Sequence, residues 1–127
     1  MNREDLIVRK SFAISHHNGF IWAENLDALY DFADIVESKF LNDMKQIKRP
    51  STPSMIAINL YETTIKENLA ETIVGGLVDA GSSVRKVALV GLRKKYISIM
   101  KQALNSHNAG FTFRFFDDFM EAKDWLV

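Results

Sequence analysis

The 127-residue chain contains no cysteine, which excludes disulfide bonds, thiol nucleophiles and metal or iron–sulfur sites held by cysteine. It has only two prolines, Pro50 and Pro53, and both lie in one short loop. No apolar stretch approaches the roughly 20 residues that span a bilayer, so no membrane span is expected. Residues 1–5 carry charges of both signs and do not look like a secretory signal, which predicts a cytoplasmic protein.

The chain also has no excess of charge of either sign, because its 16 basic and 16 acidic residues cancel. Proteins that bind nucleic acid through the phosphates normally carry a basic surplus, so a nucleic-acid partner is not expected. Hydrophobic residues make up 47% of the chain and charged residues 25%, which is ordinary for a folded protein. The length is typical of one domain, and residues 1–127 are predicted to form it.

The N-terminal part predicts a β-hairpin followed by a long helix. Residues 11–24 contain two strand-like segments around Asn18-Gly19, a dipeptide typical of tight hairpin turns. Apolar residues then recur every three or four positions, which predicts a helix over about 26–46. Asn25 is the expected N-cap of this helix.

The rest of the chain alternates apolar strands with amphipathic helices. Met55–Leu60 and Val87–Val90 are nearly continuous apolar runs, typical of strands buried on both faces, whereas Phe111–Phe115 alternates as at a sheet edge. Thr64–Glu67 and Asp118–Glu121 have the pattern of capping boxes at helix starts. The whole order predicts a single α/β domain with a mostly parallel sheet, an N-terminal hairpin and four helices.

Two adjacent glycines, Gly75 and Gly76, lie inside the predicted second helix, where each costs about 1 kcal/mol relative to alanine. Gly76 borders the apolar stripe that includes Ile73 and Leu77, whereas Gly75 lies further round the helix. We therefore expect Gly76 to permit close approach of another helix, either in this chain or across a homodimer. Gly75 is expected to have no packing role.

Three segments carry a resemblance to a known family. They are Gly19–Trp22 leading into the long helix, Val87–Leu92, and Phe115–Leu126 with the sequence FFDDFMEAKDWL. Together they resemble the STAS-type fold, and more narrowly the SpoIIAA-like (STAS/SEC14) group of small bacterial domains. The resemblance implies a STAS-like fold and a regulatory role. Residues 59–66 lack the Asp-Ser-Ser-Gly segment that is phosphorylated in anti-anti-sigma STAS proteins, so a phosphorylation switch is not expected.

Polar residues and one glycine follow the predicted parallel strands, whose carboxyl ends meet at one edge of the sheet. Thr63, Thr64, Gly91, Arg93 and Asp117 all fall at these ends, where parallel α/β sheets bind their ligands. A glycine followed by basic residues at a helix start suits an anion. Neither a dinucleotide-binding motif nor a P-loop motif is present, so no cofactor is predicted. We interpret this edge as the ligand or partner site.

The three histidines do not predict a metal site. His16 and His17 are adjacent, and successive residues of a strand point to opposite faces, while His107 lies in a distant loop. No combination of nucleophile and base indicates catalysis either. The sequence therefore predicts neither a bound metal nor an enzyme.

Two hypotheses for the function follow. The first is a non-enzymatic regulatory or binding module that contacts a protein partner or an apolar small ligand. Large side chains without an obvious core position, Phe20, Trp22, Tyr61 and Phe116, favour it, whereas Phe12 is assigned to the core. The second is a small anion- or nucleotide-binding domain, or an enzyme, that uses the edge near Thr63, Gly91 and Arg93. A homodimer is compatible with both.

Overall fold

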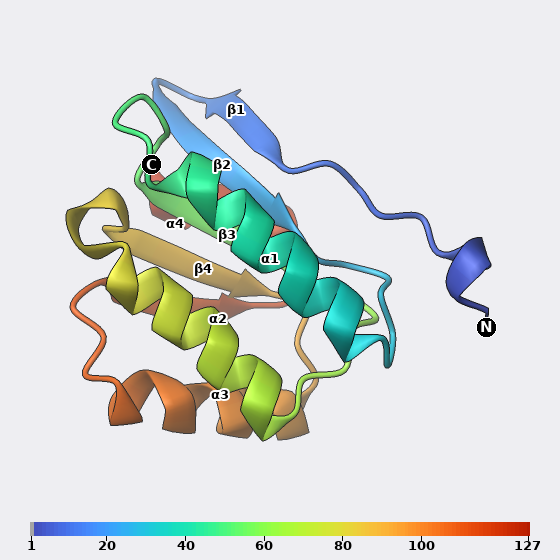
Figure 1. Ribbon diagram of the computed structural model, residues 1–127. Helices are drawn as coiled ribbons and strands as arrows, with labels where there is room; N and C mark the ends of the chain where they lie inside the picture. Colours follow the sequence, from blue (N-terminus) through green and yellow to red (C-terminus); the bar gives the residue numbers. More distant parts are fainter. Residues whose placement is uncertain (1) are drawn as a thin grey trace.

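A computed structural model, which describes residues 2–127, shows a five-stranded sheet in the order β1-β2-β3-β4-β5 (Figure 1). β1 and β2 pair antiparallel as a hairpin, and the other neighbouring pairs are parallel. The predicted α/β class, the mostly parallel sheet and the N-terminal hairpin are therefore confirmed. The strands are β1 (Phe12–His16), β2 (Gly19–Asn25), β3 (Met55–Asn59), β4 (Lys86–Val90) and β5 (Thr112–Phe116).

The helices form a layer on each face of the sheet. Helices α1 (Ala33–Ile47), α2 (Glu67–Asp79) and α3 (Lys94–Ser106) connect successive parallel strands and lie on one face (Figure 1). Because the strand order follows the chain, crossovers of one hand place all three helices on the same side. Helix α4 (Phe119–Leu126) lies on the opposite face and contacts β3, β4 and β5. Short 3-10 turns occur at Arg3–Asp5 and Gly81–Ser83.

Two apolar cores hold these layers together. The larger core lies between the sheet and α1–α3, and Phe40, Ile56 and Leu89 are completely or almost completely buried in it. The smaller core lies under α4, where Ala57 and Ala88 let the helix approach the sheet closely. Successive residues of β3 and β4 therefore enter opposite cores, as expected for strands buried on both faces. Within residues 2–127, no helix is both long and apolar enough to cross a membrane.

The prediction of a helix from residue 26 is wrong for residues 26–32. The backbone N–H groups of Leu26, Ala28 and Tyr30 donate to the carbonyls of residues 59, 61 and 62, so this segment continues beside the end of β3. Leu26 and Leu29 are buried and have helical spacing, but they lie in this loop. α1 begins at Ala33, and the expected N-cap Asn25 is instead the last residue of β2.

The predicted capping box at Thr64 is also wrong, whereas the one at Asp118 is confirmed for its N-cap. α2 begins at Glu67, and the Thr64 hydroxyl donates to Asp31 Oδ1 at 2.5 Å instead of capping the helix. The Asp118 carboxylate accepts from the Met120 N–H at 3.1 Å. The tertiary contact with Asp31 therefore replaces the local contact at Thr64.

The hairpin turn lies one residue earlier than Asn18-Gly19. His16 pairs with Gly19, so the two turn residues are His17 and Asn18. His17 takes the left-handed conformation, with φ 52°. Gly19 leaves room for the Val127 side chain, since a Cβ atom there would lie 2.8 Å from its Cγ1.

The glycine pair of α2 packs as the sequence predicts, with the contact inside the chain. A Cβ atom on Gly76 would lie 2.8 Å from Cε2 of Phe40, a residue of α1 whose side chain is completely buried. A Cβ atom on Gly75 would have only one atom of another residue within 4 Å, Cε1 of His107 at 3.7 Å. The close approach between α1 and α2 therefore depends on Gly76 alone.

We expect opposite effects from substituting these two glycines. Gly75→Ala should leave the free energy of unfolding unchanged or raise it by up to about 1 kcal/mol, because alanine favours the helix. Gly76→Ala and, more strongly, Gly76→Val should lower it by roughly 1–3 kcal/mol through overpacking against Phe40. Chemical denaturation of the single variants measures both. An unchanged midpoint for Gly76→Val would contradict the close contact.

Candidate ligand-binding site

The loops that follow β2, β3 and β4 enclose a cavity of about 270 Å³ at the carboxyl edge of the sheet. Four of the five residues predicted for this edge, Thr63, Thr64, Gly91 and Arg93, line it. The fifth, Asp117, follows β5 and lies outside the lining. The complete lining is Tyr30, Asp31, Leu60, Glu62, Thr63, Thr64, Gly91, Arg93 and Tyr96.

The backbone around this cavity is strained. Tyr30 and Glu62 have φ values of 49° and 57°, and Ala28, two residues before Tyr30, has 56°. L-amino acids other than glycine rarely adopt this left-handed region, and such strain concentrates at functional sites. Gly91, with φ 86°, adds a third lining residue in this region. Within residues 2–127, three of the five residues other than glycine with positive φ thus lie in or beside the lining of one cavity, which makes it the first candidate for a functional site.

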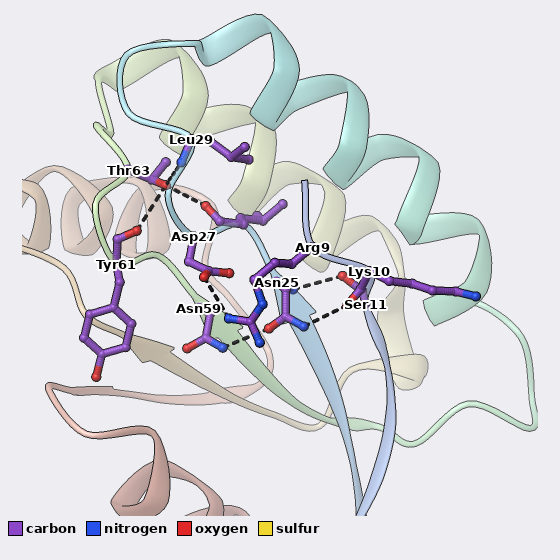
Figure 2. Close-up of polar contacts among 10 residues, drawn as sticks. Arg9, Lys10, Ser11, Asn25, Asp27, Leu29, Asn59, Tyr61 and Thr63 are labelled. Atoms are coloured by element: carbon purple, nitrogen blue, oxygen red, sulfur yellow. Dashed lines mark hydrogen bonds and ion pairs between the residues drawn. The ribbon is translucent and has the colours of Figure 1, made fainter. Parts of the chain in front are cut away.

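Thr63 is buried and fixes the position of the loop that precedes α1 (Figure 2). Its hydroxyl donates to the Leu26 carbonyl at 2.6 Å and accepts from the Leu29 N–H at 3.2 Å. Tyr30 and Thr63 also form an isolated parallel bridge. Because its hydroxyl already has two partners, Thr63 shapes the cavity and is not free to react with a ligand.

The other polar groups of the cavity are a guanidinium, two carboxylates and two phenols. Arg93 makes no salt bridge with any described residue. It precedes Lys94 and Lys95 at the start of α3, where positive charge opposes the helix dipole. The neighbouring Thr64 hydroxyl, followed by the charges of Lys95 and Arg93, lowers the pKa of Tyr96. The α3 side of the cavity is therefore suited to an anionic group.

Tyr61 lies directly against Gly91, one of the residues that line this cavity. A Cβ atom on Gly91 would lie 2.6 Å from two atoms of the Tyr61 ring, so the ring rests directly on the Gly91 backbone. The Tyr61 hydroxyl donates to the Asp117 carbonyl. Burial, followed by the charges of Asp118 and Asp117, raises the pKa of Tyr61. Asp117 therefore helps to hold the Tyr61 ring on Gly91 through its backbone carbonyl.

A second, smaller hollow of about 240 Å³ lies on the other side of Tyr61, on the face of the sheet that α4 covers. Its walls include Phe12, Ile14, Tyr61 and Phe119. Phe12 is 46% exposed, so its assignment to the core is wrong. We call this hollow the apolar pocket, to distinguish it from the strand-end cavity described above.

Asparagines at the ends of β2 and β3 form the polar end of the apolar pocket (Figure 2). Asn59 Nδ2 donates to Asn25 Oδ1 at 2.8 Å, and Asn25 Nδ2 donates to the Lys10 carbonyl at 2.9 Å. Asn59 Oδ1 is buried, has no hydrogen-bond partner among residues 2–127, and points away from Asn25. A buried acceptor without a partner is unfavourable, so a ligand that donates a hydrogen bond would be stabilised there.

The same region ties the N-terminal segment to the strand edge (Figure 2). The Asn25 N–H donates to Ser11 Oγ at 2.9 Å, and the Arg9 guanidinium donates to Asp27 Oδ2 at 2.8 Å. Asp27 follows β2 in the loop before α1. These contacts hold residues 9–11 against that loop.

Five lining residues of the strand-end cavity were not among the predicted site residues, and one of them, Leu60, is the last residue of the apolar run predicted as a strand. Tyr30 and Asp31 lie in the segment assigned to a helix, and the tertiary contacts that make it a loop are not visible in the sequence. Glu62 adjoins Thr63, and Tyr96 follows Arg93 by three positions, which is close to one helical turn. The positions of Glu62 and Tyr96 beside predicted site residues could therefore have indicated that both belong to the site.

The class of fold is established by comparison with solved structures. No protein-family model matches the chain. No curated protein matches it either. A crystal structure of an uncharacterized protein from the DUF3478 family, with a SpoIIAA-like fold, from Shewanella loihica PV-4, has a TM-score of 0.54 and 18% identity, and 93% of each chain is covered. The chain therefore has a SpoIIAA-like fold, and the resemblance to STAS-type domains is confirmed at the level of the fold.

Proposed function

We propose that this protein is a non-enzymatic binding or regulatory module, and that its ligand binds in the strand-end cavity. The observation that carries the proposal is the Arg93 guanidinium, which makes no salt bridge within residues 2–127 and lines a cavity whose backbone is strained at Tyr30 and Glu62. Backbone strain opposes stability, so its presence at two residues of one cavity, beside an exposed guanidinium, supports selection for binding.

The lining defines the chemistry of the ligand. Arg93 suits a carboxylate or phosphate, because a guanidinium donates two parallel hydrogen bonds to such groups. The carboxylates of Asp31 and Glu62 suit hydroxyl or ammonium groups of the same ligand. A volume of about 270 Å³ is just below the usual range for drug-sized ligands, which favours a compact molecule over a whole nucleotide. Amino acids and small phosphorylated polyols have this chemistry.

The hydrogen bonds of the cavity support binding rather than catalysis. Thr63 has both of its partners within the fold, and Thr64 is held by Asp31. The lining includes no histidine or cysteine, the side chains that most often act as base or nucleophile near neutral pH. The arrangement presents charges and hydroxyls to a ligand without a prepared nucleophile.

A thermal-shift panel with two pairs of variants tests this proposal. Amino acids, sugar phosphates and inorganic phosphate should raise the melting temperature of the wild-type protein, because a ligand that binds only the folded state stabilises it. Arg93→Gln should weaken the apparent affinity at least about tenfold, the loss of one charge-assisted contact. Lys94→Gln, which changes the adjacent cation outside the cavity lining, should have little effect. Equal loss in both variants would contradict a specific role of Arg93.

The apolar pocket carries a second candidate function, because Asn59 Oδ1 lacks a partner there. A small apolar molecule with a hydroxyl group, such as benzyl alcohol, would pack against Phe119 and donate to this oxygen. The same panel distinguishes the two functions. One possible result is that alcohols raise the melting temperature of the wild-type protein and of Met120→Ala but not that of Phe119→Ala. This result would indicate that the ligand binds in the apolar pocket and not in the strand-end cavity.

A protein partner, a homodimer and a cytoplasmic location stay predictions. A groove of about 560 Å³ at the opposite edge of the sheet supports a partner surface, because Phe20 is 66% exposed and Val127 is 44% exposed beside it. Large exposed apolar side chains around one groove are typical of contact surfaces.

A further inference from the structure

Two histidines and one aspartate converge at the tip of the β-hairpin. His16 Nε2 lies 2.6 Å and His17 Nε2 lies 3.2 Å from the same carboxylate oxygen, Asp124 Oδ1. The two imidazole rings are 4.1 Å apart between centroids. Within residues 2–127, this is the only group in which three or more potential ligand atoms of histidine and carboxylate side chains lie within 4.8 Å of one another.

The convergence corrects the premise that adjacent histidines of a strand face apart. β1 ends at His16, and His17 is the first residue of the turn. Its left-handed conformation, with φ 52°, turns the backbone so that its ring lies beside that of His16. Glycine or asparagine would adopt this conformation more easily. The turn therefore holds a histidine where the backbone favours other residues.

Asp124 reaches this tip from α4, which is distant from the hairpin in the sequence. The His16 side chain is 12% exposed, whereas those of His17 and Asp124 are 69% and 56% exposed. The His16 side chain is thus almost enclosed, whereas those of His17 and Asp124 are open to solvent. An ion from solution can reach all three without a change in the fold.

We propose that His16, His17 and Asp124 bind a divalent transition-metal ion of the zinc type. Two imidazole nitrogens and one carboxylate oxygen are a common ligand set for Zn²⁺ that leaves a fourth position for water. Bonds of about 2.0–2.1 Å place tetrahedral ligand atoms roughly 3.3 Å apart. The Asp124 oxygen already lies 3.2 Å from His17 Nε2, and its 2.6 Å separation from His16 Nε2 would have to lengthen when the ion binds. In the metal-free protein, both Nε2 atoms must donate protons to this oxygen, and the ion would replace these protons.

The site would join the hairpin to α4 at the end of the sheet opposite the strand-end cavity. His17 also lines the groove that includes Phe20 and Val127. The ion would therefore lie at the rim of this groove, independent of the ligand proposed for Arg93. Failure of either proposal leaves the other unaffected.

Calorimetric titration of zinc chloride into protein that was purified without a histidine tag and treated with a chelator tests the site. We expect one ion per chain with affinity in the micromolar range or tighter. His17→Ala and Asp124→Asn should weaken binding at least about tenfold, since even the loss of an outer-shell partner has effects of this size. Both residues are exposed, so the variants should fold. Zinc should also raise the melting temperature of the wild-type protein but not that of His17→Ala.

His107→Ala is the matched control, because His107 also contacts a carboxylate, that of Glu71, but no second histidine is part of that pair. This variant should bind zinc as the wild-type protein does. The absence of saturable zinc binding in the wild-type protein would overturn the site. Equal losses in His17→Ala and His107→Ala would do the same, because they would indicate nonspecific binding to exposed histidines.

Discussion

Replacing Glu24 with glutamine should remove most of the loss of stability that the wild-type protein undergoes as the pH rises from about 5 to 8. Glu24 of β2 is completely buried. Its Oε1 accepts from Trp22 Nε1 at 2.9 Å, and its Oε2 has no hydrogen-bond partner in the part of the chain that the structure describes. Burial, followed by interaction with the Asp43 carboxylate, raises the pKa of Glu24 from 4.5 to about 8. The folded protein therefore holds this proton at neutral pH.

The direction of the effect follows from proton binding. Between pH 4.5 and 8 the folded state retains a proton that the unfolded state has released, so the free energy of unfolding falls as the pH rises. The loss reaches roughly 3–5 kcal/mol before it levels off above the folded pKa. Asp43 affects the stability at acidic pH. Burial opposes the change, but contacts with Glu24 and Lys39 lower its pKa, so its contribution is lost only in acid, below pH 3.8.

Urea denaturation of wild type and Glu24→Gln at a series of pH values measures this effect. The two proteins should differ little at pH 5, and the variant should be clearly more stable at pH 8. Glu37→Gln, an exposed change on α1, should follow the wild-type profile. A wild-type stability that does not fall between pH 5 and 8, or a variant that falls in parallel with it, would show that Glu24 does not carry a buried proton.

Substitution of Gly91 by alanine should lower the free energy of unfolding by roughly 2–5 kcal/mol. Its φ of 86° is unfavourable for alanine, and its new Cβ atom would lie 2.6 Å from the Tyr61 ring. Backbone strain of this kind costs about 1–3 kcal/mol, and overpacking costs a similar amount. Gly91 lines the strand-end cavity and the displaced ring lines the apolar pocket, so ligand binding should weaken as well.

Substitutions of two other glycines distinguish the cost of backbone strain from the cost of overpacking. Gly81 has a positive φ, 58°, but no atom within 4 Å of an added Cβ, so Gly81→Ala should show the backbone cost alone. Gly110 has neither constraint, and Gly110→Ala should be neutral or slightly stabilising. Tyr61→Ala should relieve part of the cost of Gly91→Ala in the double variant. A Gly91→Ala variant no less stable than Gly81→Ala would contradict the contact with Tyr61.

The strands and helices could be predicted because their apolar residues repeat with the right period. Ile56 and Ile58 enter one core while Ala57 enters the other, which the continuous apolar run from Met55 to Leu60 indicates. Leu26 and Leu29 show where this signal fails. Their spacing is helical, but backbone hydrogen bonds to residues 59–62 hold them in a loop, and such contacts between distant segments are not encoded in local periodicity.

The candidate site could be predicted in part for a general reason. The carboxyl ends of parallel strands meet at one edge, so Thr63, Thr64, Gly91 and Arg93 were expected together before their side chains were located. The sequence indicated polar groups at this edge, but it could not indicate that the apolar pocket is separate from the cavity between them. The two hollows have no lining residue in common. The sequence favoured a protein or apolar partner for this edge, whereas the geometry favours a compact polar ligand.

The hairpin tip illustrates a different limit. The alternation of side chains along a strand places His16 and His17 on opposite faces only if both residues are extended. The structure ends the strand at His16, and the positive φ of His17 brings the rings together. Asp124 completes the cluster from the last helix, and nothing in the sequence near the histidines indicates its approach.

The claim that the strand-end cavity is the binding site is tested most directly by NMR. Amide resonances of ¹⁵N-labelled protein would be followed during titration with O-phosphoserine, which combines an anionic group for Arg93 with an ammonium group for Asp31 and Glu62. We expect saturable shifts confined to the three loops that line the cavity, with the largest at Glu62, Gly91 and Arg93. Shifts centred on Asn59 and Phe119, shifts at the hairpin tip, or no saturable shift would contradict the proposal.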